Sequence, residues 1–282
     1  MQSILITGCS TGIGYYCAQA LHKDGYKVFA TARNRDDVEN LKAEGFLSTQ
    51  LDLDSSDSID AALKWVLAQT GGELDALFNN GAYGQPGAVE DLTRDVLRAQ
   101  FETNLFGTHE LTCKALKIMR EQGYGRIIQN SSVLGLITLK YRGAYNASKF
   151  ALEGLTDTLR LELEGSPISI SLIEPGPIES DFRKNAQIAF KENIDTQQSA
   201  HKHIYEAVNK RLANEQKTQK KDPFTLGPEA VYKALKHALE STNPKARYYV
   251  TLPTWLFSIL RRVLPTQALD WVLKKISNTE NK

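Results

Sequence analysis

Residues 3–26 read SILITGCSTGIGYYCAQALHKDGY, and this stretch determines the fold class of the chain. A short apolar run leads into three glycines, Gly8, Gly12 and Gly14, and then into a segment whose apolar residues recur at helical spacing. Glycine lets a backbone turn tightly, and the free N–H groups at a helix N-terminus attract phosphate. A purely structural turn is the alternative. The position of the glycines between the first strand and the first helix favours a phosphate-binding turn.

Apolar runs and helical patterns alternate along the rest of the chain. The expected strands are Ser3–Thr7, Lys27–Ala32, Phe46–Leu51, Leu74–Phe78, Arg126–Asn130, Ile168–Ile173 and Arg247–Thr251. The longer expected helices are Leu92–Gln122, with Asn104 near its middle, Ala144–Glu164 and Gly227–Glu240. This alternation predicts an α/β fold in which helices cover both faces of a doubly wound parallel sheet. No repeat or linker interrupts the pattern, so we expect a single domain over residues 1–282.

Chemically distinctive residues follow directly after these strands. They are Gly8, Arg33, Asp52, Asn80, Ser132, Pro175 and Gly176. Ligands of open parallel sheets bind outside the carboxyl ends of the strands. We therefore expect these residues to surround one site.

The end of the second strand indicates which dinucleotide the turn would bind. A carboxylate at this position binds the ribose 2′-OH of NAD, but Ala32 offers none. Arg33 follows it and can pair bidentately with a 2′-phosphate. An ordinary surface charge is the alternative for Arg33. The pattern favours NADP(H) as the cofactor.

Residues 131–149, SSVLGLITLKYRGAYNASK, contain the candidate catalytic side chains. Residues four apart lie on one face of a helix, so Lys149 is expected beneath Tyr145. An ammonium near a phenol lowers the phenolic pKa from its usual value of about 10, and such a tyrosine can exchange a proton with an alcohol oxygen. We expect the Ser132 hydroxyl to hold the same oxygen. A solvated Tyr and Lys at this spacing is the alternative, and the glycine turn decides against it.

The composition excludes several other classes of protein. The 34 Lys and Arg residues balance 33 Asp and Glu residues, so the overall charge does not favour a nucleic-acid partner. Cys9, Cys17 and Cys113 are far apart, which fits free thiols in a reducing compartment rather than a disulfide framework or a zinc site. We expect no signal peptide, no spanning helix and no metal, and therefore a cytoplasmic protein.

In this order and spacing, the motifs resemble those of the short-chain dehydrogenase/reductase family. They are Thr7-Gly-x-x-x-Gly-x-Gly14, Asn79-Asn80, Asn104, Ser132, Tyr145-x-x-x-Lys149 and Pro175-Gly176. The resemblance is to the shorter, single-domain branch and covers roughly residues 3–180. The segments SLIEPGPI and FTLGPEAV are similar to those of bacterial NADP-dependent aldehyde reductases, which in turn resemble retinol and 17β-hydroxysteroid dehydrogenases.

The resemblance implies a Rossmann-type fold and the interconversion of an apolar aldehyde or ketone and its alcohol with NADP(H). It implies that Tyr145 is the general acid in reduction and the base in oxidation. Lys149 would hold the nicotinamide ribose, Ser132 the substrate carbonyl, and Asn104 a proton-relay water. The implied cofactor contacts are Gly8, Ser10, Thr11, Gly12, Ile13, Gly14, Arg33, Asp52, Leu53, Asn80, Gly81, Tyr145, Lys149, Pro175, Gly176, Ile178 and Ser180.

One position departs from the family pattern. The family reads Asn-Asn-Ala-Gly after the fourth strand, whereas this chain reads Asn79-Asn80-Gly81-Ala82. Because the Cβ of Ala82 disfavours positive φ, we expect an altered turn here.

Two other functions are alternatives. A catalytically silent, NADP-binding regulatory protein would have the same fold, but family members of that kind lack the Tyr or the Lys. A sugar-nucleotide epimerase of the longer branch is disfavoured by the glycine spacing and by the lack of a large C-terminal substrate domain.

The C-terminal third is expected to be helical. Residues 178–226 are mostly polar helix formers and predict a substrate lid, in which His201 and His203 face solvent. Residues 253–282 predict two amphipathic helices. In the first, the apolar face is Leu256, Ile259, Leu260, Val263 and Leu264, with Ser258, Arg261 and Arg262 opposite.

These last helices have two interpretations. They pack on the core, on the pocket entrance or on a second copy, or they contact an anionic membrane surface weakly through Trp255–Ile276. From Lys245 onward, seven Lys or Arg residues stand against Asp270 and Glu280, which suits an anionic surface. We also expect a small-molecule substrate and a homodimer or homotetramer.

Overall fold

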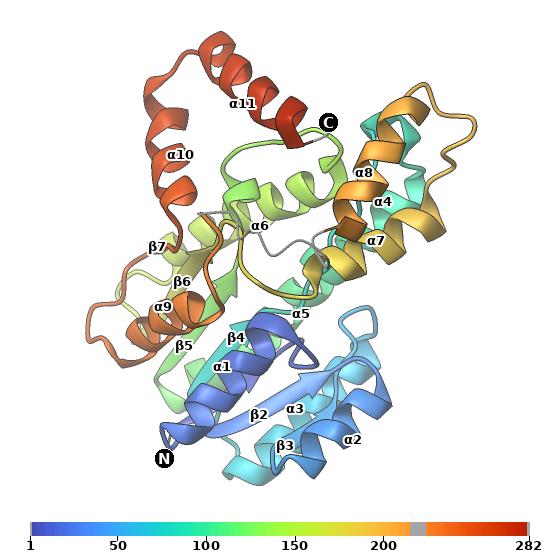
Figure 1. The fold of residues 1–282 in the computed structure, drawn as a ribbon. Coiled ribbons are helices and arrows are strands. Elements are labelled where there is room, and N and C mark those ends of the chain that lie inside the picture. Colours follow the sequence, from blue (N-terminus) through green and yellow to red (C-terminus); the bar gives the residue numbers. More distant parts are fainter. Residues whose placement is uncertain (1, 215–223, 281–282) are drawn as a thin grey trace.

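The structure is a computed structural model that describes residues 2–214 and 224–280. Its centre is a sheet of seven parallel strands in the order β3-β2-β1-β4-β5-β6-β7 (Figure 1). The strands are β1 (Ser3–Ile6), β2 (Lys27–Ala32), β3 (Leu47–Gln50), β4 (Ala76–Asn79), β5 (Gly125–Asn130), β6 (Ile168–Glu174) and β7 (Arg247–Tyr249). The predicted fold class is confirmed, and the strand ends lie within two residues of those predicted.

The strand order reverses direction at β1. Strands β2 and β3 lie on one side of it, whereas β4 and the later strands lie on the other. In the register, Leu5 is opposite Phe29 on one side and Leu77 on the other. Doubly wound sheets bind ligands at such a switch point, outside the carboxyl ends of the strands. The chain segments that leave β1 and β4 therefore define the expected site.

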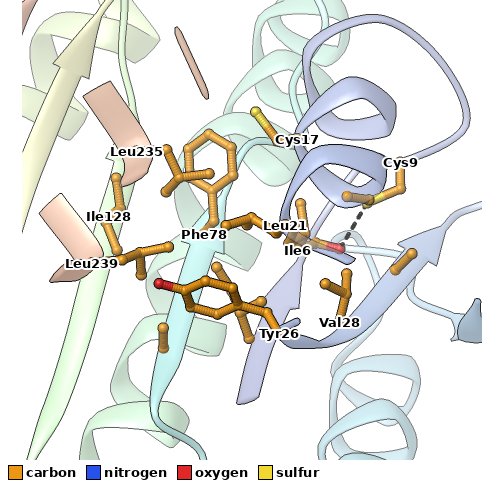
Figure 2. Close-up of a cluster of buried hydrophobic side chains, with 14 of the residues drawn as sticks. Ile6, Cys9, Cys17, Leu21, Tyr26, Val28, Phe78, Ile128, Leu235 and Leu239 are labelled. Carbon is orange, nitrogen blue, oxygen red and sulfur yellow. Dashed lines mark hydrogen bonds between the residues drawn. The ribbon is translucent and has the colours of Figure 1, made fainter. Parts of the chain in front are cut away.

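Helices cover both faces of the sheet. One face carries α1 (Gly12–Lys23), α2 (Arg35–Ala43) and α9 (Glu229–Glu240), and the other carries α3 (Ser56–Thr70), α5 (Thr108–Gln122) and α6 (Gly143–Glu162). Figure 2 shows the first face, where Leu235 and Leu239 of α9 lie beside Phe78 and Ile128 of the sheet. Burial on both faces explains why the strand sequences are nearly continuous apolar runs.

The single long helix predicted over Leu92–Gln122 is divided in the structure. It consists of α4 (Arg94–Phe101), a π-helical segment η2 (Glu102–Gly107) and α5. A Cβ on Gly107 would lie only 1.9 Å from the carbonyl oxygen of Leu53, so only glycine permits this close approach. The helix therefore widens where it passes the loop that follows β3.

Two helices, α7 (Phe182–Asn193) and α8 (Lys202–Asn214), occupy the predicted lid region. They share an apolar cluster that contains Phe190, Tyr205 and Val208 and extends to Ala88 in the loop after β4. Residues 215–223 of the predicted lid lie outside the described residues. The closing function of these helices stays a prediction.

The last two helices, α10 (Leu252–Val263) and α11 (Thr266–Glu280), form an angled pair next to α6 (Figure 1). Phe257 and Leu273 pack with Ile137 in a small apolar cluster. Ser258 lies on the side of α10 opposite the exposed Leu256 and Val263, as predicted. Ser258 is buried and its hydroxyl donates to the Trp255 carbonyl at 2.7 Å, because α10 turns its Thr254–Ser258 side to the protein.

Candidate active site

The turn after β1 has the geometry of a phosphate cradle. Gly8 and Gly12 have φ of +69° and +61°, a region that favours glycine. A Cβ on Gly14 would lie 2.2 Å from the Gly8 carbonyl oxygen, so the turn can close this tightly only around glycine. Thr11 precedes α1 without capping it through its side chain. The first N–H groups of α1 thus fit a pyrophosphate, and Ser10 and Ile13 lie on the same turn.

The segment that follows β4 is hydrogen-bonded to this turn. The Thr7 hydroxyl accepts hydrogen bonds from the backbone N–H groups of Asn80 at 2.9 Å and Gly81 at 2.7 Å. The Asn80 amide nitrogen donates to the Thr7 and Gly8 carbonyls at 3.0 and 3.2 Å, and its oxygen accepts from the Asn130 amide at 2.9 Å. The Asn80 side chain therefore braces the cradle.

Ala82 has no positive φ, and the alteration of this turn relative to the family pattern stays a prediction. Tyr141 has the only positive φ among the described non-glycine residues, and Gly81 also has no positive φ. A Cβ on Gly8 would lie 2.9 Å from the Gly81 Cα, so close packing between the two glycines is the constraint here. The order Gly81-Ala82 satisfies that constraint without backbone strain.

Arg33, Asp52 and Leu53, the contacts predicted for the adenosine part of the cofactor, follow the ends of β2 and β3. Arg33 is exposed, and its carbonyl accepts from the Gln50 amide at 2.9 Å. Burial and the Asp54 carboxylate raise the phenolic pKa of Tyr83, whereas the positive charge of Arg33 lowers it. The Asp52 carboxylate accepts from the Asp54 N–H at 3.1 Å, and Leu53 is buried.

Ser132, Tyr145 and Lys149 come together as predicted. Ser132 follows β5, Tyr145 lies in the first turn of α6, and all three residues are buried. The Ser132 hydroxyl lowers the phenolic pKa of Tyr145 and accepts a hydrogen bond from the Leu134 N–H at 3.1 Å. The Lys149 ammonium lies 5.7 Å from the centre of the Tyr145 ring and donates to the Asn130 carbonyl at 2.7 Å. A proton donor, a hydroxyl and a cation thus meet at the carboxyl edge of the sheet.

The expected direction of the Tyr145 pKa shift is wrong for the protein alone. Burial raises the pKa of Tyr145 to about 12, although the Ser132 hydroxyl lowers it. Burial also lowers the pKa of the Lys149 ammonium to about 8, against a raising effect from Glu153. Desolvation disfavours the charged form of each group, and here it outweighs their mutual attraction. Tyr145 therefore holds its proton at neutral pH, which suits a general acid.

Asn104 lies in the π-helical segment, beside the catalytic helix. Its amide donates to the Tyr83 carbonyl at 2.9 Å and to the Ser148 hydroxyl at 3.2 Å, and its oxygen accepts from the Tyr83 N–H at 3.2 Å. These bonds position the loop after β4 against α6. The proton-relay water stays a prediction.

The segment after β6 closes the site from the other side. The Pro175 carbonyl accepts from the Val133 N–H at 2.8 Å, and a Cβ on Gly176 would lie 2.2 Å from the Thr251 hydroxyl. Ile178 pairs with Leu226 in an isolated bridge. Ser180 lies opposite the glycine turn, because a Cβ on Gly12 would lie 3.0 Å from the Ser180 Cβ. The segment therefore faces the cradle, as predicted.

The sequence did not indicate two features of the lid region. The Phe182 ring packs edge-on against Tyr145, with 5.2 Å between ring centres. His201, expected in solvent, is partly buried, and its ring contacts the Glu90 carboxylate at 2.6 Å and the Tyr141 hydroxyl at 3.4 Å. Both contacts join segments far apart in the chain, so neither has a local sequence signal.

The described residues contain no cluster of three or more His, Cys, Asp or Glu side chains suited to a metal. Within the same residues, no helix combines the length and the apolar character needed to cross a bilayer. The candidate site itself consists of Tyr, Ser and Lys groups. They can protonate an oxygen while a cation and a hydroxyl stabilise it.

Proteins similar in sequence are oxidoreductases. The protein named uncharacterized oxidoreductase YbbO of Escherichia coli (strain K12) is 42% identical over 273 residues, which cover 97% of this chain and 94% of that protein. Human retinol dehydrogenase 8 is 32% identical over 263 residues, which cover 87% of this chain and 80% of that protein.

Solved structures share the fold. A short-chain dehydrogenase/reductase from Burkholderia phymatum in complex with NAD has a TM-score of 0.75 at 23% identity, covering 92% of this chain and 91% of that one. An actinorhodin polyketide ketoreductase with NADPH has a TM-score of 0.67 at 26% identity, covering 88% and 95%. The family model described as short chain dehydrogenase matches residues 2–189, from the strand before the glycine turn to beyond Ser180. By this match the chain belongs to the short-chain dehydrogenase/reductase family, and it is an oxidoreductase.

Proposed function

We propose that the protein is an NADP(H)-dependent oxidoreductase that interconverts an apolar aldehyde or ketone and its alcohol. The observation that carries this proposal is the buried arrangement of Ser132, Tyr145 and Lys149 beside the glycine cradle. In reduction, Tyr145 donates its proton to the carbonyl oxygen, and the Ser132 hydroxyl holds that oxygen by a hydrogen bond. In oxidation, Tyr145 accepts the proton back.

The tight turn fits a dinucleotide, since a Cβ at Gly14 would lie 2.2 Å from the Gly8 carbonyl oxygen, and the free N–H groups of the α1 N-terminus suit a pyrophosphate. Bound NADPH supplies the hydride that reduces the carbonyl carbon. The choice of NADP(H) over NAD(H) rests on Arg33, because related solved structures contain NAD in one case and NADPH in another. Lys149 is placed to hold the ribose and to stabilise the phenolate that forms when Tyr145 gives up its proton.

An apolar substrate is supported by the surroundings of Tyr145. The Phe182 ring packs on it, and α7 and α8 contribute a buried apolar cluster nearby that contains Phe190. Relatives include retinol dehydrogenase 8 and a 17-beta-hydroxysteroid dehydrogenase from mouse, both named for apolar alcohols.

A substrate panel tests the proposed reaction. We expect NADPH oxidation with apolar aldehydes or ketones, at kcat/KM values at least about tenfold above those for short polar carbonyl compounds, because each buried methylene adds to selectivity. Absorbance of NADPH measures the rate, and Tyr145→Phe is the negative control. Tight NADPH binding without turnover on any compound would instead favour the catalytically silent regulatory protein.

We also propose a homodimer or homotetramer in the cytoplasm. Exposed apolar side chains on α4, η2 and α6 support an interface between copies: Leu97, Phe106, Leu155 and Leu161. The free thiols of Cys9, Cys17 and Cys113 are consistent with a reducing compartment. Light scattering of the purified chain measures the oligomeric state.

We further propose that α10 and α11 contact an anionic membrane surface. Their large apolar side chains are 40–65% exposed: Leu252, Trp255, Leu256, Ile259, Val263 and Trp271. Arg262, Lys274 and Lys275 are exposed on the same two helices, and the Lys275 ammonium lies 3.8 Å from the centre of the Trp271 ring. Aromatic and aliphatic side chains flanked by cations suit the membrane interface, and the positive charge favours anionic lipid.

Substitutions on the exposed face test this contact better than truncation, which would also remove Phe257 and Leu273 from their cluster. We expect the double variant Trp255→Ser, Val263→Ser to lower partitioning onto phosphatidylglycerol vesicles at least about tenfold, since each buried large apolar side chain contributes ~1.5–3 kcal/mol. Co-sedimentation measures the partitioning.

The matched control is Ile188→Ser, which removes an exposed apolar residue of α7. Equal sedimentation of wild type and double variant would refute the membrane contact. A change from oligomer to monomer in the double variant would show that the face binds a second copy of the chain instead.

A further inference from the structure

A row of ionisable side chains continues below the catalytic residues of α6. Tyr145, Lys149, Glu153 and Asp157 are spaced four residues apart and therefore follow one face of the helix. Glu153 is only 6% exposed, and its negative charge raises the pKa of the Lys149 ammonium. A buried carboxylate thus lies one turn below the catalytic lysine.

One guanidinium holds this carboxylate in place. Arg247, the first residue of β7, pairs with Glu153, with Asp157 at 2.5 Å and with Glu174 at 2.5 Å. Glu174, the last residue of β6, has no exposed surface. We call these four residues the Arg247 cluster. Buried carboxylates require such partners, because an uncompensated charge away from water is strongly unfavourable.

The Arg247 cluster touches both segments that face Tyr145 and the cradle. Glu153 and Ser131 are neighbours, since a Cβ on Gly135 would lie 2.9 Å from both the Glu153 Cγ and the Ser131 hydroxyl, and Ser131 directly precedes Ser132. The Ser131 N–H donates to the Ile173 carbonyl at 2.7 Å, and Glu174 directly precedes Pro175 of the closing segment. The cluster therefore connects the serine loop, the catalytic helix and the segment after β6.

We propose that Glu153 is a positioning residue of the reaction, whose carboxylate, fixed by Arg247, keeps the Lys149 ammonium charged and directed at the Asn130 carbonyl. This inference rests on the proposed function, because it assigns Glu153 a role in the same proton transfer. Glu153 acts through Lys149 and does not itself touch the reacting atoms.

The charges around Glu153 support this role. Three carboxylates surround one guanidinium, and burial together with the neighbouring carboxylates raises the pKa of Glu174 to about 8. Burial also raises the pKa of Glu153, whereas the Arg247 guanidinium lowers it and so favours the charged form of this carboxyl group. Asp157 also contacts the Arg160 guanidinium at 3.3 Å and is about 40% exposed, so Glu153 is the buried anion next to Lys149.

The sign of the effect follows from the charges. A nearby anion favours the ammonium form of Lys149, so its removal lets Lys149 lose its proton at lower pH. The pKa of this ammonium, already lowered to about 8 by burial, would then fall further. Carbonyl reduction that depends on the ammonium would therefore decline at a lower pH in a Glu153 variant.

The test compares Glu153→Gln with Asp157→Asn. We expect Glu153→Gln to move the alkaline limb of the kcat profile for carbonyl reduction down by about one pH unit, the lower end for losing a close opposite charge. Asp157→Asn removes a carboxylate that pairs with the same guanidinium but lies one helical turn further from Lys149. This variant should leave the alkaline limb unchanged. Glu153→Asp keeps the charge and should restore the limb toward that of the wild type.

Titration of NADPH fluorescence between pH 6 and 10 provides a readout that needs no turnover. The dissociation constant should rise at a lower pH for Glu153→Gln than for the wild type or Asp157→Asn. Identical limbs and identical binding profiles for the two variants would overturn the role of Glu153. Failure of the wild type to reduce any carbonyl compound would refute the proposed function instead, while a shifted NADPH profile would still support the link between Glu153 and Lys149. If Glu153→Gln does not fold, the Glu153→Asp variant is measured instead. The alkaline limb of its kcat profile must match that of the wild type.

Discussion

Tyr145→Phe is expected to lower the turnover number for carbonyl reduction at least ~10²-fold, the low end of what a positioned general acid contributes. The substitution removes one hydroxyl and keeps the ring, so the packing against Phe182 at 5.2 Å is retained. The buried Tyr145 hydroxyl, whose pKa burial raises to about 12, is protonated at neutral pH and is the group proposed to give its proton to the carbonyl oxygen. Steady-state kinetics measure the loss.

Cofactor binding separates this effect from damage to the fold. The NADPH dissociation constant of Tyr145→Phe should stay close to that of the wild type, because the glycine cradle and Lys149 are unchanged. The matched control is Tyr124→Phe, which removes a phenol bonded to Glu73 at 3.0 Å, away from the site. Near-normal turnover of a folded Tyr145→Phe protein would refute the assignment of Tyr145 as the acid.

The sequence predicted the features that depend on local chemistry. Gly8, Gly12 and Gly14 identified the cradle because only glycine permits its φ angles and its close approach. The four-residue spacing of Tyr145 and Lys149 gave their relation on α6, since the helix fixes which residues share a face. Strand ends were predicted within two residues because the apolar runs end where the sheet ends.

Features that depend on contacts between distant segments could not be predicted. The π-helical segment that holds Asn104 forms where Gly107 passes the Leu53 carbonyl, and no local pattern announces that contact. The sequence left the orientation of α10 open, because the packed side includes the polar residues Thr254 and Ser258. Periodicity alone places the larger apolar face inside, whereas here that face is largely exposed.

The pKa shifts at the site also depend on contacts and burial that the sequence does not give. Proximity of Lys149 predicted a lowered Tyr145 pKa, but burial is the larger effect, and the sequence does not give the depth of burial. Glu153 follows Lys149 by four residues in the sequence. This spacing is the signal that could have identified Glu153 as a neighbour of the lysine. Arg247 joins it only because β6 and β7 are paired, with Glu174 opposite Tyr249.

Arg33→Gln is expected to weaken NADPH binding roughly tenfold to a hundredfold, because a charge-assisted hydrogen bond contributes about 1.5–3 kcal/mol. Ala32 ends β2 without a carboxylate, and the exposed Arg33 side chain follows it at the edge of the crevice. No other described side chain is hydrogen-bonded to the Arg33 guanidinium, so it is available to a 2′-phosphate. NADH lacks that phosphate, and its dissociation constant should change little. Fluorescence titration measures both constants.

Arg35 is the matched control, because it is an equally exposed guanidinium two residues later, at the start of α2. It already donates to the Gln50 side chain at 3.3 Å, and the Gln50 amide in turn donates to the Arg33 carbonyl. Arg35→Gln should therefore affect NADPH and NADH equally. Equal dissociation constants of the wild type for the two cofactors would refute the NADP(H) preference. A selective loss of NADPH binding in Arg35→Gln but not in Arg33→Gln would retain the preference for NADP(H). It would show that Arg35, and not Arg33, binds the 2′-phosphate, since the two side chains differ in position and not in charge.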